Sequence, residues 1–267
     1  NYNHNSNVSE TDDFRTDVVA MNSLPELDDS TSEYNGARKF SVVQAPAQAT
    51  EPITIKVYAN AADAAAGTNA IDTINYSVYS YCRDIIENYT GEKATEMKAL
   101  AKSTLDYAAA AQLFFNYNTD EMATKDNANN AFYGDVAGAD LSNVAGPGAL
   151  ATGIEQVSVV VKSDLEINLL SRNKINVTDY NLDTTKGGTR FKATSVEEKN
   201  GDFYVIHIEG IDPDNMDNTI TVNTDCGDIV MTANSVMKAM AGSSDEKMVT
   251  LAKAMYLYGV AANNYFA

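Results

Sequence analysis

The sequence predicts an α+β fold in which β-sandwich-like strand sets lie beside a cluster of about four helices. Three observations predict it: short stretches that alternate apolar and polar residues, two long segments with helical apolar spacing, and a repeat that joins them twice in the same order. Because each strand set has one apolar face, two sheets, or a sheet and a helix layer, must cover one another.

The repeat is clearest in two long segments, residues 97–115 and 248–266. They read MKALAKSTLDYAAAAQLFF and MVTLAKAMYLYGVAANNYF, and eight of the 19 positions are identical. This agreement predicts an internal duplication and two related helices packed about a pseudo-twofold axis. The apolar stripe of each segment is expected to be core, and no binding role is placed on it.

Shorter elements precede each long helix in the same order. Period-two alternation predicts six strands before the helices: 40–43, 53–55, 71–76, 203–206, 220–222 and 229–231. Short helices are expected over 77–88 and 233–241. Four further strands are expected in the second half: 156–163, 165–171, 174–178 and 189–197.

These patterns divide the chain into four parts. We expect residues 1–12 to form a flexible lead-in, 13–116 the first strand set plus helix pair, 117–153 a join, and 154–267 the second strand set plus helix pair. The two halves either form separate lobes or complete a single core. In the join, Thr119 is expected to cap a short helix that begins at Asp120.

Composition excludes several classes of function. The chain has 37 acidic and 19 basic side chains, a net charge of −18, which opposes binding to nucleic acid or to an anionic membrane. It has no run of about 18 apolar residues, so no membrane insertion is expected. The opening NYNHNSNVSE has no charged and apolar leader, and any signal peptide is expected to have been removed.

Residues that carry catalysis are scarce. His4 lies in an Asn-rich stretch, and His207 lies in an alternating strand, where a half-buried structural role is expected. No G-x-S-x-G, H-E-x-x-H, C-x-x-C or phosphate-binding loop motif occurs. We therefore assign no catalytic residue, no metal ligand and no cofactor, and expect that the protein is not an enzyme.

Two further features have structural explanations. Cys82 and Cys226 fit either a disulfide or two buried thiols, and the sequence leaves both open. The acidic stretch 212–217 has carboxylates at spacings seen in calcium loops. It lacks the glycine and the bidentate Glu of such a loop, so a Pro-Asp turn between strands is the better prediction.

Aromatic residues outside the periodic segments are the candidates for ligand binding. Sugar recognition uses a flat ring for the C–H face of a pyranose and polar side chains for its hydroxyls. Five aromatic residues lie in turn-like, polar settings: Tyr34, Tyr117, Phe132, Tyr133 and Tyr180. The alternative is that each ring fixes its loop to the core.

The string YSVYSYCRDIIENYTGEKATEMKALAKSTLDYAAAAQLFFNYNTD resembles a module that recurs in surface and secreted proteins of gut clostridia. VSVVVKSDLEINLL and TLAKAMYLYGVAANNYF resemble the second half of that module, so the likeness covers about residues 38–267. Such modules are similar to the glucan-binding domains of the starch adherence system of amylosomes. The chain departs from these in having no dockerin-type calcium loop and no tryptophan.

This resemblance implies a β-sandwich with a helical cluster and a non-catalytic, secreted or cell-surface domain that captures starch or maltooligosaccharide. Any scaffold attachment would lie outside these residues, and the sugar platform would be Tyr or Phe. Two alternatives stay open: a structural or protein-interaction module of a surface protein, and a glycosidase that uses carboxylates alone.

Overall fold

The computed structural model describes residues 19–24, 26, 44–161, 165–184 and 190–267. Within them it has five α-helices and nine strands in three antiparallel sheets, which confirms the α+β class. The chain forms two compact units, Asn1–Gln44 with Pro52–Ser77 and Ala45–Glu51 with Val78–Ala267, here called the first and second unit. No helix of the described part is long and apolar enough to cross a bilayer.

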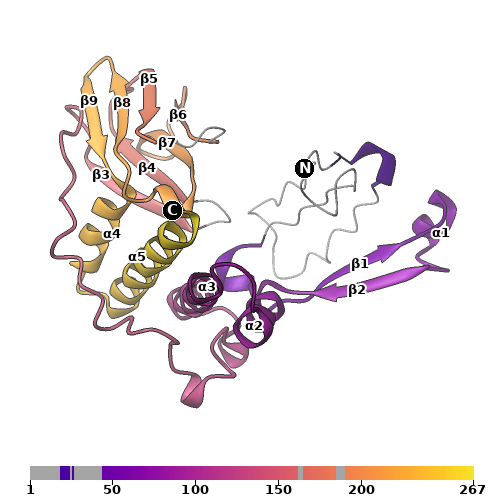
Figure 1. Cartoon of the computed structure of the whole chain (residues 1–267). Coiled ribbons are helices and arrows are strands. Elements are labelled where there is room, and N and C mark those ends of the chain that lie inside the picture. Colours follow the sequence, from indigo (N-terminus) through magenta and orange to yellow (C-terminus); the bar gives the residue numbers. More distant parts are fainter. Residues whose placement is uncertain (1–18, 25, 27–43, 162–164, 185–189) are drawn as a thin grey trace. The chain divides into compact units, whose positions relative to one another are not determined.

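In the first unit, β1 (Ile53–Val57) and β2 (Asp72–Tyr76) form an antiparallel hairpin that is visible in Figure 1. The strands are connected through α1 (Ala61–Ala66), a short helix that the sequence did not predict. The side chain of Asn60 caps α1, and Gly67 ends it with a φ of +67°, a conformation that suits glycine. The predicted lead-in at 1–12 and strand at 40–43 lie outside the described residues.

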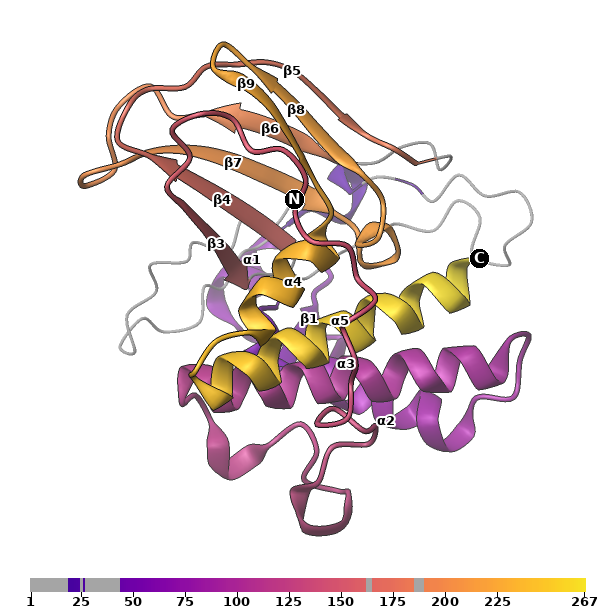
Figure 2. The same cartoon turned by 90° about the vertical axis from the view of Figure 1, so that its left-hand side faces the viewer.

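The second unit contains a β-sandwich, as predicted. The four-stranded sheet has the order β3-β4-β7-β6, with β3 (Gln156–Val161), β4 (Leu165–Ser171), β6 (Lys192–Ser195) and β7 (Tyr204–Ile211). The three-stranded sheet has the order β5-β8-β9, with β5 (Val177–Leu182), β8 (Ile220–Thr224) and β9 (Gly227–Met231). Figure 2 shows the two sheets stacked with α4 and α5 beneath them.

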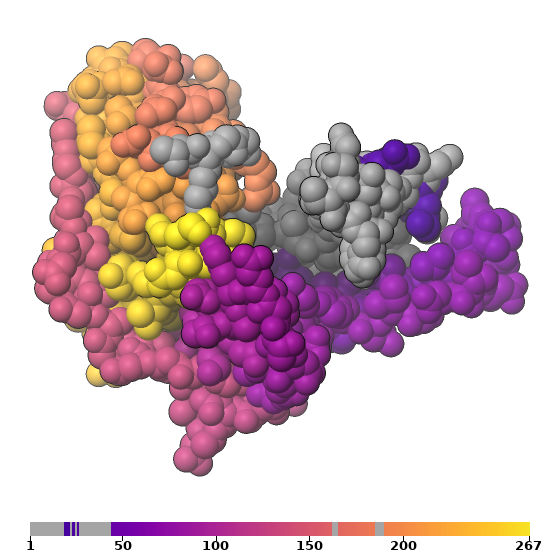
Figure 3. Space-filling model, in the orientation of Figure 1, coloured from indigo at the N-terminus to yellow at the C-terminus, as the bar shows by residue number. Residues whose placement is uncertain are grey.

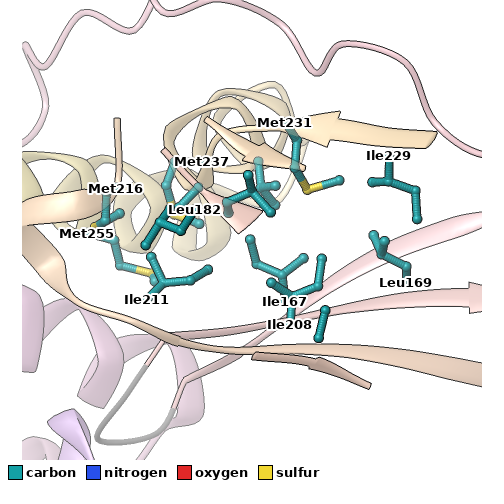
Figure 4. Packing of buried hydrophobic residues seen from close by; sticks show 14 of the residues in the cluster. Ile167, Leu169, Leu182, Ile208, Ile211, Met216, Ile229, Met231, Met237 and Met255 are labelled. Carbon is teal, nitrogen blue, oxygen red and sulfur yellow. The ribbon is translucent and has the colours of Figure 1, made fainter. Parts of the chain in front are cut away.

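The core lies between the two sheets and continues onto the helices. Alternation along β4 and β7 buries Ile167, Leu169 and Ile208, which face side chains of β9 such as Ile229. Figure 4 shows that methionines of the helices close one end of this cluster, among them Met237 and Met255.

The four main helices form two pairs, α2 (Val78–Asn88) with α3 (Ala94–Phe115) and α4 (Ala233–Ala241) with α5 (Glu246–Phe266). The long helices α3 and α5 pack on each other, and Figure 3 shows the yellow atoms of α5 directly against the purple atoms of the first pair. Small residues permit this approach: Ala110 and Ala111 of α3 and Ala254 of α5 are all buried in the same cluster. At the contact, the ring of Tyr107 stacks on that of Tyr258 at 5.5 Å.

The join between the helix pairs contains only two short 3-10 turns among its described elements, η3 (Thr119–Glu121) and η4 (Ala128–Asn130). The prediction that Thr119 caps a helix is wrong. Asn118 occupies the cap position in a left-handed conformation, with no capping hydrogen bond from its side chain. Beyond these turns, Lys253 donates to the carbonyl oxygen of Ala137, and Lys238 donates to those of residues 142 and 144, so the join is held along α4 and α5.

Both helix pairs follow the same series of elements. A 3-10 turn, a hairpin, a short helix and a long helix occur as η2 (Pro46–Gln48), β1, β2, α2 and α3, and again as η5 (Pro213–Asn215), β8, β9, α4 and α5. The turn η5 also confirms the Pro-Asp turn expected between strands. The shared order is a property of the structure, while a common origin by duplication stays a prediction.

Candidate functional site

The sequence-predicted aromatic residues lie on different elements. Tyr34 lies outside the described residues. Tyr117 follows α3 and is 38% exposed, and its hydroxyl donates to the carboxylate of Glu51. The neighbouring Asn118 donates to the hydroxyl of Thr50 at 3.2 Å. Tyr117 is therefore an exposed ring with an acid and an amide beside it.

Tyr180 lies on a strand, and the turn-like setting predicted for it is wrong. The predicted strand 174–178 is displaced to Val177–Leu182, where Tyr180 pairs with Val222 of β8. Pairing with β8 thus overrides the local turn preference of the neighbouring Asp and Asn. The ring is 42% exposed and meets the edge of Phe191 at 5.8 Å.

Phe132 and Tyr133 are adjacent in the join, and both are half-buried and pack against the core cluster that contains Leu105 and Ala123. The ring of Phe132 is half-buried and packs against both hydrophobic clusters of the second unit, so it fixes the join to the core. Tyr133 keeps its hydroxyl at the surface of the first helix pair, where it accepts a hydrogen bond from Nη1 of Arg83 at 3.1 Å.

Tyr133 belongs to a network that we call the Tyr133 cluster, made of Tyr79, Arg83, Asp126 and Tyr133. Besides the Tyr133 hydroxyl, the guanidinium of Arg83 approaches Asp126, with Nε 3.4 Å from Oδ2. The hydroxyl of Tyr79 donates to the same carboxylate. Tyr79 and Arg83 are four residues apart on α2 and so project from one side of it, while Asp126 and Tyr133 come from the join.

A buried carboxylate holds Tyr133 in place. Asp106 of α3 is 3% exposed and accepts hydrogen bonds from the backbone N–H groups of Tyr133 at 2.7 Å and Gly134 at 2.8 Å. Desolvation raises the pKa of Asp106 to about 6, while the two N–H donors act in the opposite direction. Asp106 is thus a positioning residue for the cluster.

Electrostatics tie the members of the cluster together. Burial, followed by the hydrogen bond to Asp126, raises the pKa of the Tyr79 phenol. The hydrogen bond to Tyr133 raises the pKa of Arg83, so its guanidinium stays charged. The ammonium of Lys125 lies 5.0 Å from the centroid of the Tyr79 ring, a cation–π contact that adds a further donor at the edge of the cluster.

Sequence reasoning found Tyr133 but missed Tyr79, Arg83 and Asp126. Tyr79 and Arg83 lie in the segment 77–88, for which only a short helix was expected and no binding role was assigned. The missed signal is the polar spacing of Tyr79, Arg83 and Glu87, which marks one side of α2 as a surface that can form hydrogen bonds.

A second feature of the second unit is a groove of about 480 Å³ bounded by α2, α3, α5 and η5. Of the two expected core stripes, that of α5 is mainly buried, but Leu100 and Thr104 of α3 are half-buried and line this groove. The remaining lining is largely apolar: Val78, Tyr81, Cys82, Ile85, Met97, Ala101, Asp212, Pro213, Asp214, Tyr258, Ala262 and Phe266.

The two cysteines and His207 have different surroundings in the structure. Cys82 is a buried free thiol whose pKa desolvation raises to about 12, and Cys226 is an exposed free thiol, so the two do not form a disulfide and only one of them is buried. His207 lies half-buried on β7 with Nδ1 2.7 Å from Oε1 of Glu166.

Comparison with protein-family models, with curated proteins and with solved structures gave no significant match to this chain. Among the described residues, no group of three or more His, Cys, Asp or Glu side chains is placed to hold a metal ion. The candidate site is therefore defined by the geometry of the Tyr133 cluster and its surroundings.

Proposed function

We propose that this protein is a non-catalytic carbohydrate-binding module that captures α-1,4-glucan chains such as starch and maltooligosaccharides. The proposal combines the resemblance of residues 38–267 to glucan-binding domains with the surface chemistry of the first helix pair. In this proposal the parent protein acts outside the cell, where such polysaccharides are found.

The observation that carries the proposal is the Tyr133 cluster. It brings two tyrosines, a guanidinium and a carboxylate together in one network on the surface of α2 and the join. Planar polar groups beside aromatic rings suit a pyranose, because its hydroxyls both donate and accept while its C–H face packs on a ring. The exposed ring of Tyr117, next to Glu51 and Asn118, offers the same chemistry.

Affinity electrophoresis in amylopectin and calorimetry with maltoheptaose test the proposal. We expect retardation and saturable binding by the wild type. Replacing Tyr133 by Ala should weaken binding about two- to tenfold, the loss typical of one stacked ring. Asp126→Asn should act in the same direction, and added salt should have little effect because the ligand is neutral.

Tyr76→Ala is the matched control, because Tyr76 is also a surface tyrosine, 43% exposed, but lies on β2 of the first unit. It should bind as the wild type does. Flat calorimetry of the wild type at millimolar maltoheptaose would overturn the proposal. Normal affinity of Tyr133→Ala with weakened Tyr117→Ala or Tyr180→Ala would keep the function and move the site.

A second candidate function is a protein-interaction module. It is favoured by the apolar residues that the first unit exposes on and beside β2: Ile71 is 67%, Ile74 45% and Tyr76 43% exposed. Single exposed apolar residues are ordinary, but a row of them along one hairpin is typical of an interaction surface. No response of the wild type to any soluble glucan would favour this second function.

A further inference from the structure

We propose that the groove bounded by α2, α3, α5 and η5 binds a small amphiphilic cation, a molecule with an apolar, preferably aromatic, body and a protonated amine at one end. This site is independent of the proposed function. It uses a different side of α2, since Val78, Tyr81, Cys82 and Ile85 line the groove, whereas Tyr79 and Arg83 belong to the Tyr133 cluster.

The walls of the groove select an apolar body. Its volume of about 480 Å³ falls within the range of small-molecule sites, and its helical walls carry aliphatic side chains such as Leu100 and Met97. Three aromatic residues, Tyr81, Tyr258 and Phe266, come from α2 and α5. Tyr81 and Phe266 are 47% and 57% exposed, so their rings are accessible to a ligand.

The residues at η5 select a positive charge. Asp212 and Asp214 line the groove on either side of Pro213, and no Lys or Arg is among the described residues that line it. Burial raises the pKa of the Tyr258 phenol, which also lines the groove, and the carboxylates of Asp212 and Asp214 act in the same direction. Nη2 of Arg190 lies 3.6 Å from Oδ1 of Asp212, so Arg190 already forms an ion pair with one of the two carboxylates. The ammonium of the ligand is therefore assigned to Asp212 and Asp214 together and not to Asp212 alone.

Aromatic rings next to carboxylates are a combination that recognises ammonium groups, because the ring face and the acid both attract a cation. A neutral saccharide suits this groove poorly, since most of the lining offers no partner for its hydroxyls. The charge of −18 on the whole chain further favours a cation over an anion of the same shape.

Calorimetry with three probes of equal length tests the proposal: 4-phenylbutylammonium, 4-phenylbutanol and 4-phenylbutanoate. We expect saturable one-to-one binding of the ammonium, about fivefold tighter than the alcohol and at least about tenfold tighter than the carboxylate. The double variant Asp212→Asn with Asp214→Asn should remove most of the preference for the ammonium over the alcohol. Tyr81→Ala should weaken the ammonium and the alcohol alike, about two- to tenfold.

Asp202→Asn, at an exposed acid in the turn between β6 and β7, is the matched control and should bind all three probes as the wild type does. Circular dichroism of each variant establishes that it is folded. Equal affinity for the three probes, absence of saturation at about 10 mM ammonium, or normal binding by both groove variants would overturn the proposal. The starch-binding assays do not depend on any of these results.

Discussion

The two hairpins that precede the helix pairs share a register but differ in what surrounds them. In the first, Ile53 lies opposite Tyr76 and Ile55 opposite Ile74. In the second, Ile220 lies opposite Met231 and Val222 opposite Ile229. All four of these second-hairpin residues are at most 3% exposed, whereas every residue of β2 is exposed.

The difference arises from strands that only the second hairpin has. β5 pairs with the free edge of β8, and the four-stranded sheet covers the apolar face. An alternating sequence therefore specifies which face of a strand is apolar, but the rest of the fold decides whether that face is covered.

Replacing one isoleucine at the same place in each hairpin should show the largest difference in stability between the two hairpins. We expect Ile229→Ala to lower the free energy of unfolding by about 2 to 5 kcal/mol, because it opens a cavity in the core. Ile74→Ala should cost no more than about 0.5 kcal/mol, since Ile74 is 45% exposed. Urea denaturation followed by circular dichroism measures both, and equal losses would show that the first hairpin is covered in solution.

A second test uses the long helices, where Asp106 of α3 corresponds to Leu257 of α5 at the offset of 151 residues. The pKa of Asp106 is about 6 in the folded protein and 3.8 for an unperturbed carboxyl, so folding favours its protonated form. The stability from this group is complete below pH 3.8 and is lost as the pH rises through 6. The expected loss is up to about 3 kcal/mol.

The measurement compares Asp106→Asn with the wild type from about pH 3.5 to 7, a range that brackets both pKa values. The difference in unfolding free energy, wild type minus variant, should fall as the pH rises, because the amide does not titrate. A difference that is constant with pH would show that Asp106 keeps an ordinary pKa in the fold.

The smallest effect concerns the contact of each long helix with its 3-10 turn. A Cβ at Gly259 would lie 2.8 Å from Sδ of Met216 and 3.3 Å from the carbonyl oxygen of Pro213. In the first half, Ala108 corresponds to Gly259 at the offset of 151 residues. Ala49 corresponds to Met216, because each directly follows its 3-10 turn, and Ala49 and Ala108 are buried in one cluster. The second half thus combines a methionine with a glycine where the first half has two alanines.

We expect Gly259→Ala to cost about 1 kcal/mol, as the strain of overpacking exceeds the gain in helix propensity. Met216→Ala should cost more, because it leaves a cavity. In the double variant the new Cβ has room. The loss of stability of the double variant should therefore be about 1 kcal/mol smaller than the sum of the two single-variant losses. Thermal or urea unfolding of the four proteins measures this cycle, and strict additivity would contradict the proposed complementarity of the two contacts.

The helices were largely predictable from the sequence, because strong local signals mark their ends. α4 has the predicted bounds: Thr232 accepts a hydrogen bond from the N–H of Ser235 at its start, and Gly242 follows its end. β5 was misplaced, since its pairing with β8 depends on residues about 40 positions away. α1 was missed because six alanine-rich residues carry no periodic signal.

The candidate site was predictable only in part. Tyr133 was identified as an aromatic residue in a polar stretch, but Arg83 is 50 residues away, and the two meet because Asp106 fixes the join to α3. The groove was not expected at all, because periodicity assigned Leu100 and Thr104 to the core. Helical spacing shows that residues share a side of a helix, but the neighbouring elements determine whether that side is filled.

The unequal exposure of the two thiols has a practical consequence. Cys82 is buried, while Cys226 lies exposed in the tight turn between β8 and β9. A maleimide reagent would therefore modify the native protein at one position, in the turn between two strands of the sandwich. That position offers a defined point for attaching a fluorophore or a sensor surface.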